Sequence, residues 1–153
     1  MSSPEFDTAK LFPGRFFISS VLDVLESKKR MTGHMRRRYL QRATMAGIII
    51  GIFYVIDYSI IAAFDSLGDE PEQFHVIGKL LGSAVFGWAL VFIYYSKSEL
   101  LTSNMMMVAI GTYYRRLTPM LVTRILGFCY LGNILGGLIV AGLLRGSTLI
   151  NDA

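Results

Sequence analysis

The stretch Ser96-Lys97-Ser98-Glu99-Leu100-Leu101-Thr102-Ser103-Asn104 is polar and carries two charges inside an otherwise apolar part of the chain. Residues 76–95, just before it, are apolar and long enough to cross the ~30 Å hydrocarbon core of a bilayer as a helix. A second apolar run, 105–114, follows with no aqueous loop between. One straight helix over 76–114 would be about 58 Å long, nearly twice the core thickness. The segment must therefore bend or contain non-helical residues.

Two interpretations of the polar stretch are open. In the first, the span ends at Tyr95 and the polar residues form an ordinary loop. In the second, which the length favours, the helix breaks at membrane depth and resumes beyond. Non-helical backbone in a bilayer is tolerated only where protein buries it or where it lines a watery cavity. A break therefore predicts a permeation site, and its Ser, Lys, Glu, Thr and Asn side chains supply hydrogen-bond donors and acceptors.

Composition indicates an integral membrane protein. Of the 153 residues, 53% are hydrophobic and only 17% are charged, which is too apolar for a soluble domain. The net charge of +4 could suggest a nucleic-acid partner, but the basic residues concentrate beside a hydrophobic span. We assign them to membrane topology and to contacts with anionic lipid, and we expect no nucleic acid.

No enzyme signature is present. The single Cys129 has no partner for a disulfide or a paired-cysteine metal site within the chain, and we expect a small buried residue. His34 and His75 lie far apart and show no ligand spacing. We therefore expect no catalytic residue, no metal and no cofactor.

Charge also predicts the topology. Residues 1–42 hold nine Lys/Arg against four Asp/Glu, so we place this segment in the cytoplasm, whereas the acidic loop 65–73 has no basic residue and should lie outside. A surface-lying amphipathic helix is expected within 1–42 from the spacing of its apolar residues: Phe16, Phe17, Val21, Leu22, Val24 and Leu25. Residues 43–145 form the three-span region of a multi-pass cell-membrane protein, and residues 146–153 form a short external tail.

The fold class expected is an all-α membrane protein with three transmembrane helices, the second broken by the polar loop. The spans are predicted at 43–64, at 76–114 with its break, and at 120–144. Asp57 lies within the first span, where a carboxylate costs about 2.5–3.5 kcal/mol on insertion scales. It is either a functional acid or a hydrated carboxylate near the far interface.

Small residues on two spans predict close helix contact. Gly47 and Gly51 lie one turn apart on the first span, and Gly132 and Gly136 do so on the third. Asn133, beside the second pair, is expected to form hydrogen bonds between helices.

Residues 98–104 resemble part of the Gly-Ala-Glu-Leu-Phe-Thr-Gly-Asn signature of the formate/nitrite transporter family. Further matches in family order are Ala46-Gly47 with Gly51, Phe86-Gly87-Trp88-Ala89-Leu90, and Tyr130-Leu131-Gly132-Asn133 with Gly136. The resemblance covers about 42–144. It implies an aquaporin-like fold of two inverted three-span repeats, each with one broken helix, of which this chain corresponds to the first.

The resemblance also implies a function, a channel or transporter for small monovalent anions such as formate, nitrite or hydrosulfide, assembled as a homopentamer with one pore per protomer. By position, Phe86 matches the outer constriction, Leu90 and Leu101 match the inner one, and Thr102 matches the loop hydroxyl facing the anion. Ser103 and Lys97 complete the candidate pore residues. Leu101 stands where the family has Phe, which reshapes the inner gate, and Lys97 stands where it usually has Gly.

The chain stops after one repeat, so we expect a fragment, a truncated product or one half of a split transporter. It should need a second half, either another chain or an inverted copy, because broken-helix backbone would otherwise face lipid. The alternative function is a non-transporting membrane protein that uses its glycine faces for assembly and its basic segment for lipid or a cytoplasmic partner. Lys97 either raises the local anion concentration, or pairs with Glu99 or reaches toward the interface along its alkyl stem.

Overall fold

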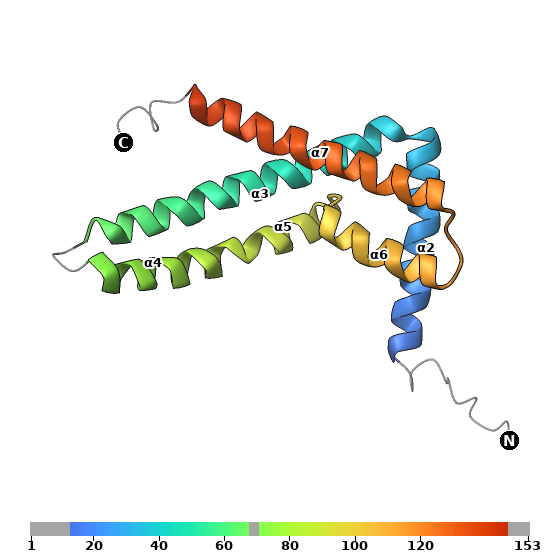
Figure 1. Cartoon of the computed structure of the whole chain (residues 1–153), viewed down its shortest axis with the longest axis horizontal. Coiled ribbons are helices and arrows are strands. Elements are labelled where there is room, and N and C mark those ends of the chain that lie inside the picture. The colour runs from blue at the N-terminus through green and yellow to red at the C-terminus, as the bar shows by residue number, and fades with distance from the viewer. Residues whose placement is uncertain (1–12, 68–70, 147–153) are drawn as a thin grey trace, which may run out of the picture.

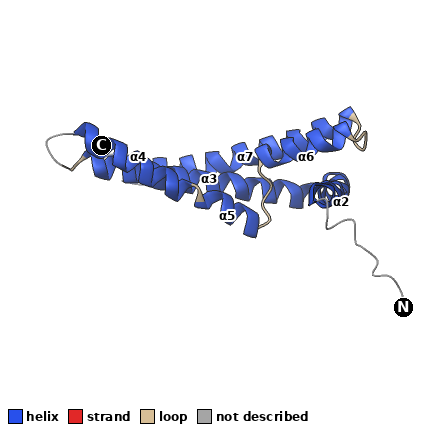
Figure 2. Cartoon of the chain, turned by 90° about the horizontal axis from the view of Figure 1, so that it is seen from below, coloured by secondary structure: helices blue, strands red, loops and turns tan. Residues whose placement is uncertain are grey.

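The computed structural model describes residues 13–67 and 71–146, and in these ranges the chain is helical without strands. Its helices are α2 (Pro13–His34), α3 (Arg36–Asp65), α4 (Pro71–Phe86), α5 (Trp88–Tyr95), α6 (Leu101–Tyr113) and α7 (Pro119–Arg145), shown in Figures 1 and 2. The N-terminal residues 1–12 and most of the predicted tail lie outside the described residues.

Three segments are long and apolar enough to cross a membrane: Arg36–Asp65, Phe74–Tyr95 and Pro119–Arg145. The all-α membrane class with three spans is therefore confirmed, and so is the break in the second span. The non-helical residues are 96–100, fewer than the nine expected. Thr102, Ser103 and Asn104 belong to the first turn of α6, because the Asn104 N–H already donates to the Leu100 carbonyl at 3.0 Å.

The two ends of the molecule differ. In Figure 1, the end of α3, the start of α4 and the end of α7 lie at one end, while α2 and the α6–α7 connection lie at the other. Helix α2 crosses the direction of the spans, as the expected surface-lying helix would. This arrangement is compatible with the predicted topology, in which the basic end is cytoplasmic and the acidic end external. That orientation remains a prediction.

Glycines let α3 approach α7 closely. A Cβ added at Gly136 would meet backbone atoms of Thr44, Gly47 and Ile48, and one at Gly47 would meet the Asn133 carbonyl. A Cβ added at Gly132 would meet Ala43, and one added at Gly51 would lie 3.0 Å from the side chain of Val140. The four glycines therefore lie where the first and third spans cross, within one chain.

The main apolar core joins α2 to the break region. Its buried residues are Val21, Leu25, Tyr39, Ala43, Val108, Ile125 and Cys129. On α2 only part of the expected apolar stripe is covered, because Phe16 is 68% exposed and Phe17 is also exposed. The face of α2 that packs continues instead from Val21 and Leu25 to Lys28 and Thr32, both buried.

Candidate functional site at the helix break

The second span ends in a tight left-handed turn. Lys97 has φ 52°, and its N–H donates to the Tyr94 carbonyl at 3.2 Å, while the Ser98 N–H donates to the Ile93 carbonyl at 3.1 Å. These two bonds form a Schellman motif with Lys97 in the position that usually requires glycine. The turn ends the helix and directs residues 98–100 across the molecule.

Asn133 of α7 holds the broken segment from one side. Its side-chain oxygen accepts a hydrogen bond from the Leu101 N–H at 3.1 Å. Its amide nitrogen donates to the Glu99 carbonyl and to the Ala43 carbonyl of α3, both at 2.9 Å. One side chain thus ties the break to two spans.

Arg42 of α3 holds the other side. Its guanidinium donates to the Lys97 carbonyl, at 2.6 Å from Nε, and its own carbonyl accepts from the Glu99 N–H at 3.1 Å. Much of the broken backbone is therefore paired inside the chain. The expectation that this backbone would face lipid without partners is wrong, because Arg42 and Asn133 supply those partners.

A buried charged cluster lies beside the break. Lys28 and Glu99 are each 5% exposed and Asn104 is 1% exposed. Lys28 Nζ forms an ion pair with Glu99 and donates to Asn104 Oδ1 at 2.6 Å, while Asn104 Nδ2 donates to Glu99 Oε2 at 3.2 Å. Arg42 adds a second cation, 3.7 Å from Glu99 Oε1. The cluster therefore holds two cations against one carboxylate.

A hollow of about 410 Å³ opens beside this cluster. Three of the six candidate pore residues line it, Leu90, Lys97 and Ser103, together with Lys28 and Glu99. The other three lie elsewhere: Leu101 packs against the main core, Thr102 is exposed on the first turn of α6, and Phe86 is half-buried at the end of α4.

A family model described as formate/nitrite transporter matches residues 17–153. The chain belongs to the formate/nitrite transporter family. An uncharacterized transporter of Bacillus subtilis (strain 168), YrhG, is 30% identical over 97 residues, which are 63% of this chain and 34% of the relative. The match thus spans about a third of the length of that relative. No solved structure matches this chain.

Two residues of the cluster were not foreseen from the sequence of this formate/nitrite transporter family member. Lys28 stands in the run Lys28-Lys29-Arg30, which has the pattern of a solvated basic face, although Val21, Leu25, Lys28 and Thr32 recur at helical spacing and indicate one packed face. Asn104 was assigned only to the polar stretch. The alternative that Lys97 pairs with Glu99 is not what the structure shows, because Glu99 pairs with Lys28 and Arg42.

Three other polar residues lie away from the break. Asp57 Oδ1 is buried without a hydrogen-bond partner in the described part of the chain, where Gly82 of α4 leaves room for it. His75 Nδ1 lies 2.8 Å from Asp65 Oδ1 at the α3–α4 end. Among residues 13–67 and 71–146, no group of His, Cys, Asp and Glu side chains could hold a metal ion.

Replacing Lys97 with glycine should stabilise the protein. A side chain in the left-handed region costs about 1–2 kcal/mol, and glycine loses about 0.5–1 kcal/mol through the entropy of the unfolded chain, so the expected net gain is about 0.5–1 kcal/mol. Denaturant unfolding in detergent measures it. Lys97→Ala keeps the backbone strain and should not stabilise the protein. Arg115→Gly, at a residue with φ 53°, should stabilise it as Lys97→Gly does. Equal stability of Lys97→Gly and Lys97→Ala would contradict this account.

Proposed function

We propose that this chain forms one wall of a path for small monovalent anions, such as formate or nitrite, and that the path passes the helix break. The observation that carries the proposal is the excess positive charge there. Lys28 and Arg42 face a single carboxylate, Glu99, and Lys97 lines the same hollow. A unit charge 4 Å from an anion contributes about 4 kcal/mol at an effective dielectric of 20, before desolvation is subtracted.

The start of α6 adds to this attraction. The helix begins at Leu101, next to the break, so the positive end of its dipole lies there. Carbonyl groups at the end of α5 would repel an anion, but those of Ile93 and Tyr94 already accept hydrogen bonds in the Schellman motif. Ser103, on the first turn of α6, offers a hydroxyl to the hollow. An anion can therefore exchange part of its hydration shell for these donors.

A complete path needs further protein around this wall. Tyr94 and Tyr95, next to the break, are each 79% exposed, and Thr102 and Ser103 are exposed as well. We propose that a second three-span half covers them, supplied by another chain or by an inverted copy, within a homo-oligomer for which the resemblance suggests a pentamer. We place this assembly in the cell membrane with the N-terminus in the cytoplasm. The chain alone, inserted in one orientation, should not conduct.

Formate or nitrite flux in the transporting assembly tests the charge of Lys97. Lys97→Gln keeps the backbone strain and removes the charge, so flux per folded protein should fall roughly two- to fivefold, as for a partly screened charge. Lys97→Arg should retain wild-type flux, and Lys79→Gln, an exposed charge on α4, should have no effect. If Lys97→Gln lowers only the amount of folded protein, Lys97 is structural. The non-transporting alternative predicts no flux for any variant.

A further inference from the structure

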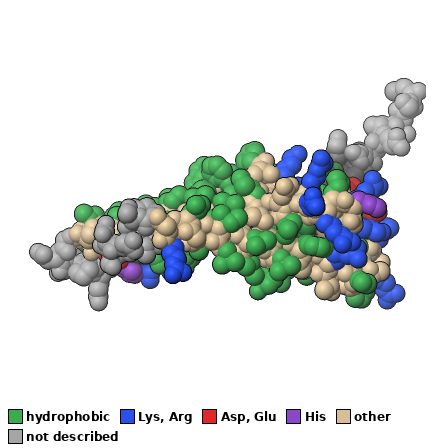
Figure 3. Space-filling model, turned by 90° about the horizontal axis from the view of Figure 1, so that it is seen from above, with side chains coloured by type: hydrophobic (Ala, Val, Ile, Leu, Met, Phe, Trp, Pro, Cys, Tyr) green, Lys and Arg blue, Asp and Glu red, His purple; other side chains and the backbone are tan. Residues whose placement is uncertain are grey.

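A second basic surface lies away from the break, where α2 meets the start of α7. A hollow of about 500 Å³ is bordered there by Lys29, Arg30, His34 and Arg124, with Glu26 as its one acidic residue. Figure 3 shows that Lys and Arg side chains gather at this end of the molecule. The volume is in the range of ligand pockets, about 300–1,000 Å³.

The basic surface extends onto α3. A neighbouring hollow of about 560 Å³ shares Gly33 and His34 with the first and adds Arg36, Arg37 and Arg38. Each hollow is bordered by three Lys or Arg side chains, and the two hollows together contain one carboxylate, that of Glu26. The ion pairs of the described residues involve none of these six cations. The charge of this surface is therefore left for an anionic partner.

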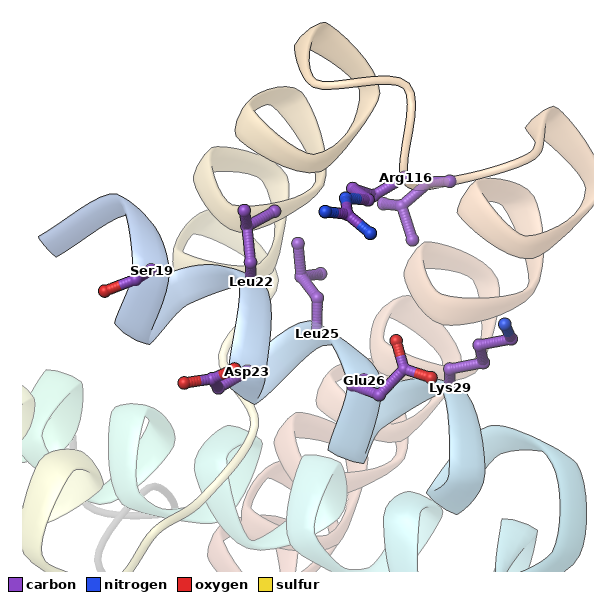
Figure 4. Close-up of a pocket in the computed structure, with 8 residues that line it drawn as sticks. Ser19, Leu22, Asp23, Leu25, Glu26, Lys29 and Arg116 are labelled. Carbon is purple, nitrogen blue, oxygen red and sulfur yellow. The ribbon is translucent and has the colours of Figure 1, made fainter. Parts of the chain in front are cut away.

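An adjoining cavity, which shares Glu26 and Lys29 with the first hollow, has balanced charge. It measures about 250 Å³ and is bordered by Asp23 and Glu26 on one hand and by Lys29 and Arg116 on the other, as Figure 4 shows. Two acids against two bases give no preference for an anion. Among these three cavities, the excess of positive charge is thus confined to the two that are bordered by Arg30 and Arg124 or by Arg36, Arg37 and Arg38.

Apolar side chains adjoin the cations. Met120 and Leu121 also border the first hollow, and Met120 is 75% exposed. Both belong to the first turn of α7, one of the three candidate spans. Thr118, just before this turn, also borders the hollow, and its side chain makes no capping hydrogen bond. A ligand here meets cations and a hydroxyl at one end and the start of a membrane span at the other.

We propose that this hollow binds the headgroup of an anionic phospholipid. Lys29, Arg30 and Arg124 contact the phosphate, and Met120 and Leu121 lie along the start of an acyl chain. A free phosphate ion would use the cations alone and would leave the exposed methionine without a role. Juxtamembrane basic clusters attract anionic lipid in general, and the hollow makes the attraction a site with a defined position.

Native mass spectrometry of the full chain in detergent tests the site with phosphatidylglycerol and phosphatidylcholine of equal acyl chains. The wild-type protein should retain phosphatidylglycerol in preference to phosphatidylcholine. In Lys29→Gln/Arg124→Gln, the ratio of bound phosphatidylglycerol to bound phosphatidylcholine should fall about tenfold. The matched control Arg115→Gln/Arg116→Gln removes two charges at the same end of the molecule but outside the hollow. It should keep the wild-type preference for phosphatidylglycerol. Lys29→Arg/Arg124→Lys keeps the charges and should bind as the wild type does.

Three results would overturn the proposal. An equal loss in both glutamine variants would mean that overall charge, not this hollow, attracts the lipid. Equal retention of the two lipids by the wild-type protein would mean that no anionic site exists. Displacement of phosphatidylglycerol by an equimolar amount of inorganic phosphate would mean that the acyl chain contributes nothing and that the ligand is a free anion. If Lys29→Gln/Arg124→Gln does not fold, the proposal is still tested by Lys29→Arg/Arg124→Lys and by the comparison of the two lipids on the wild-type protein.

Discussion

Gly136→Ala should lower the free energy of unfolding by about 3 kcal/mol, whereas Gly137→Ala, one residue further, should raise it by about 0.5–1 kcal/mol, because alanine favours the helix over glycine. A Cβ at Gly136 would meet backbone of α3 on three residues, Thr44, Gly47 and Ile48, and backbone cannot move aside as a side-chain tip can. At Gly137 no atom lies within 4 Å of the added carbon. Denaturant unfolding in detergent, followed by circular dichroism, measures both variants.

Gly47→Ala extends the test to the partner helix. Its Cβ would meet the backbone carbonyl of Asn133, the residue whose side chain holds the break. This substitution should therefore also loosen the bond between Asn133 and Leu101. Equal stability of the Gly136 and Gly137 variants would show that α3 and α7 do not cross as described.

Lys28→Met should destabilise the protein strongly. It leaves Glu99 buried without its main partner, and removal of one member of a buried ion pair costs about 3–5 kcal/mol. Lys28→Met/Glu99→Gln should recover most of that loss, because a neutral amide carries no charge to desolvate and still accepts from Asn104. The measurement is the free energy of unfolding in detergent.

Lys29→Met is the matched control. Lys29 is the next residue of α2 and is exposed, so the same loss of charge there should cost less than about 0.5 kcal/mol. Similar effects of Lys28→Met and Lys29→Met would show that Lys28 is solvated. A double variant as unstable as Lys28→Met alone would show that the lost stability does not come from the unpaired carboxylate.

The break could be predicted from length and polarity alone. A span that starts near residue 76 and an apolar run that ends near 114 exceed the bilayer, and the polar stretch with two charges lies between them. The predicted start at Ser96 is confirmed, but the predicted end lies too far along the chain because Thr102, Ser103 and Asn104 are polar. Polar residues are common in the first turn of a helix, so polarity marked the break without marking where α6 begins.

The charged cluster could not be predicted in the same way. Lys28 and Glu99 are 71 residues apart, and a lysine next to Lys29 and Arg30 has the pattern of a solvated basic run. Only the packing of α2 against α6 brings Lys28 to Glu99. Asn133 was expected to bond between helices, but its bond to Leu101 depends on the path of the loop, which local sequence does not specify.

If small anions pass the break, they should protect a cysteine at position 103 from chemical modification. Cys129 is fully buried, so the wild-type protein supplies the background. In membranes containing the transporting assembly, Ser103→Cys should react with a small anionic methanethiosulfonate. Formate or nitrite should slow this reaction several-fold, while sulfate at equal ionic strength should leave it unchanged. A modification rate at Ser103→Cys that formate and nitrite do not alter would contradict the account.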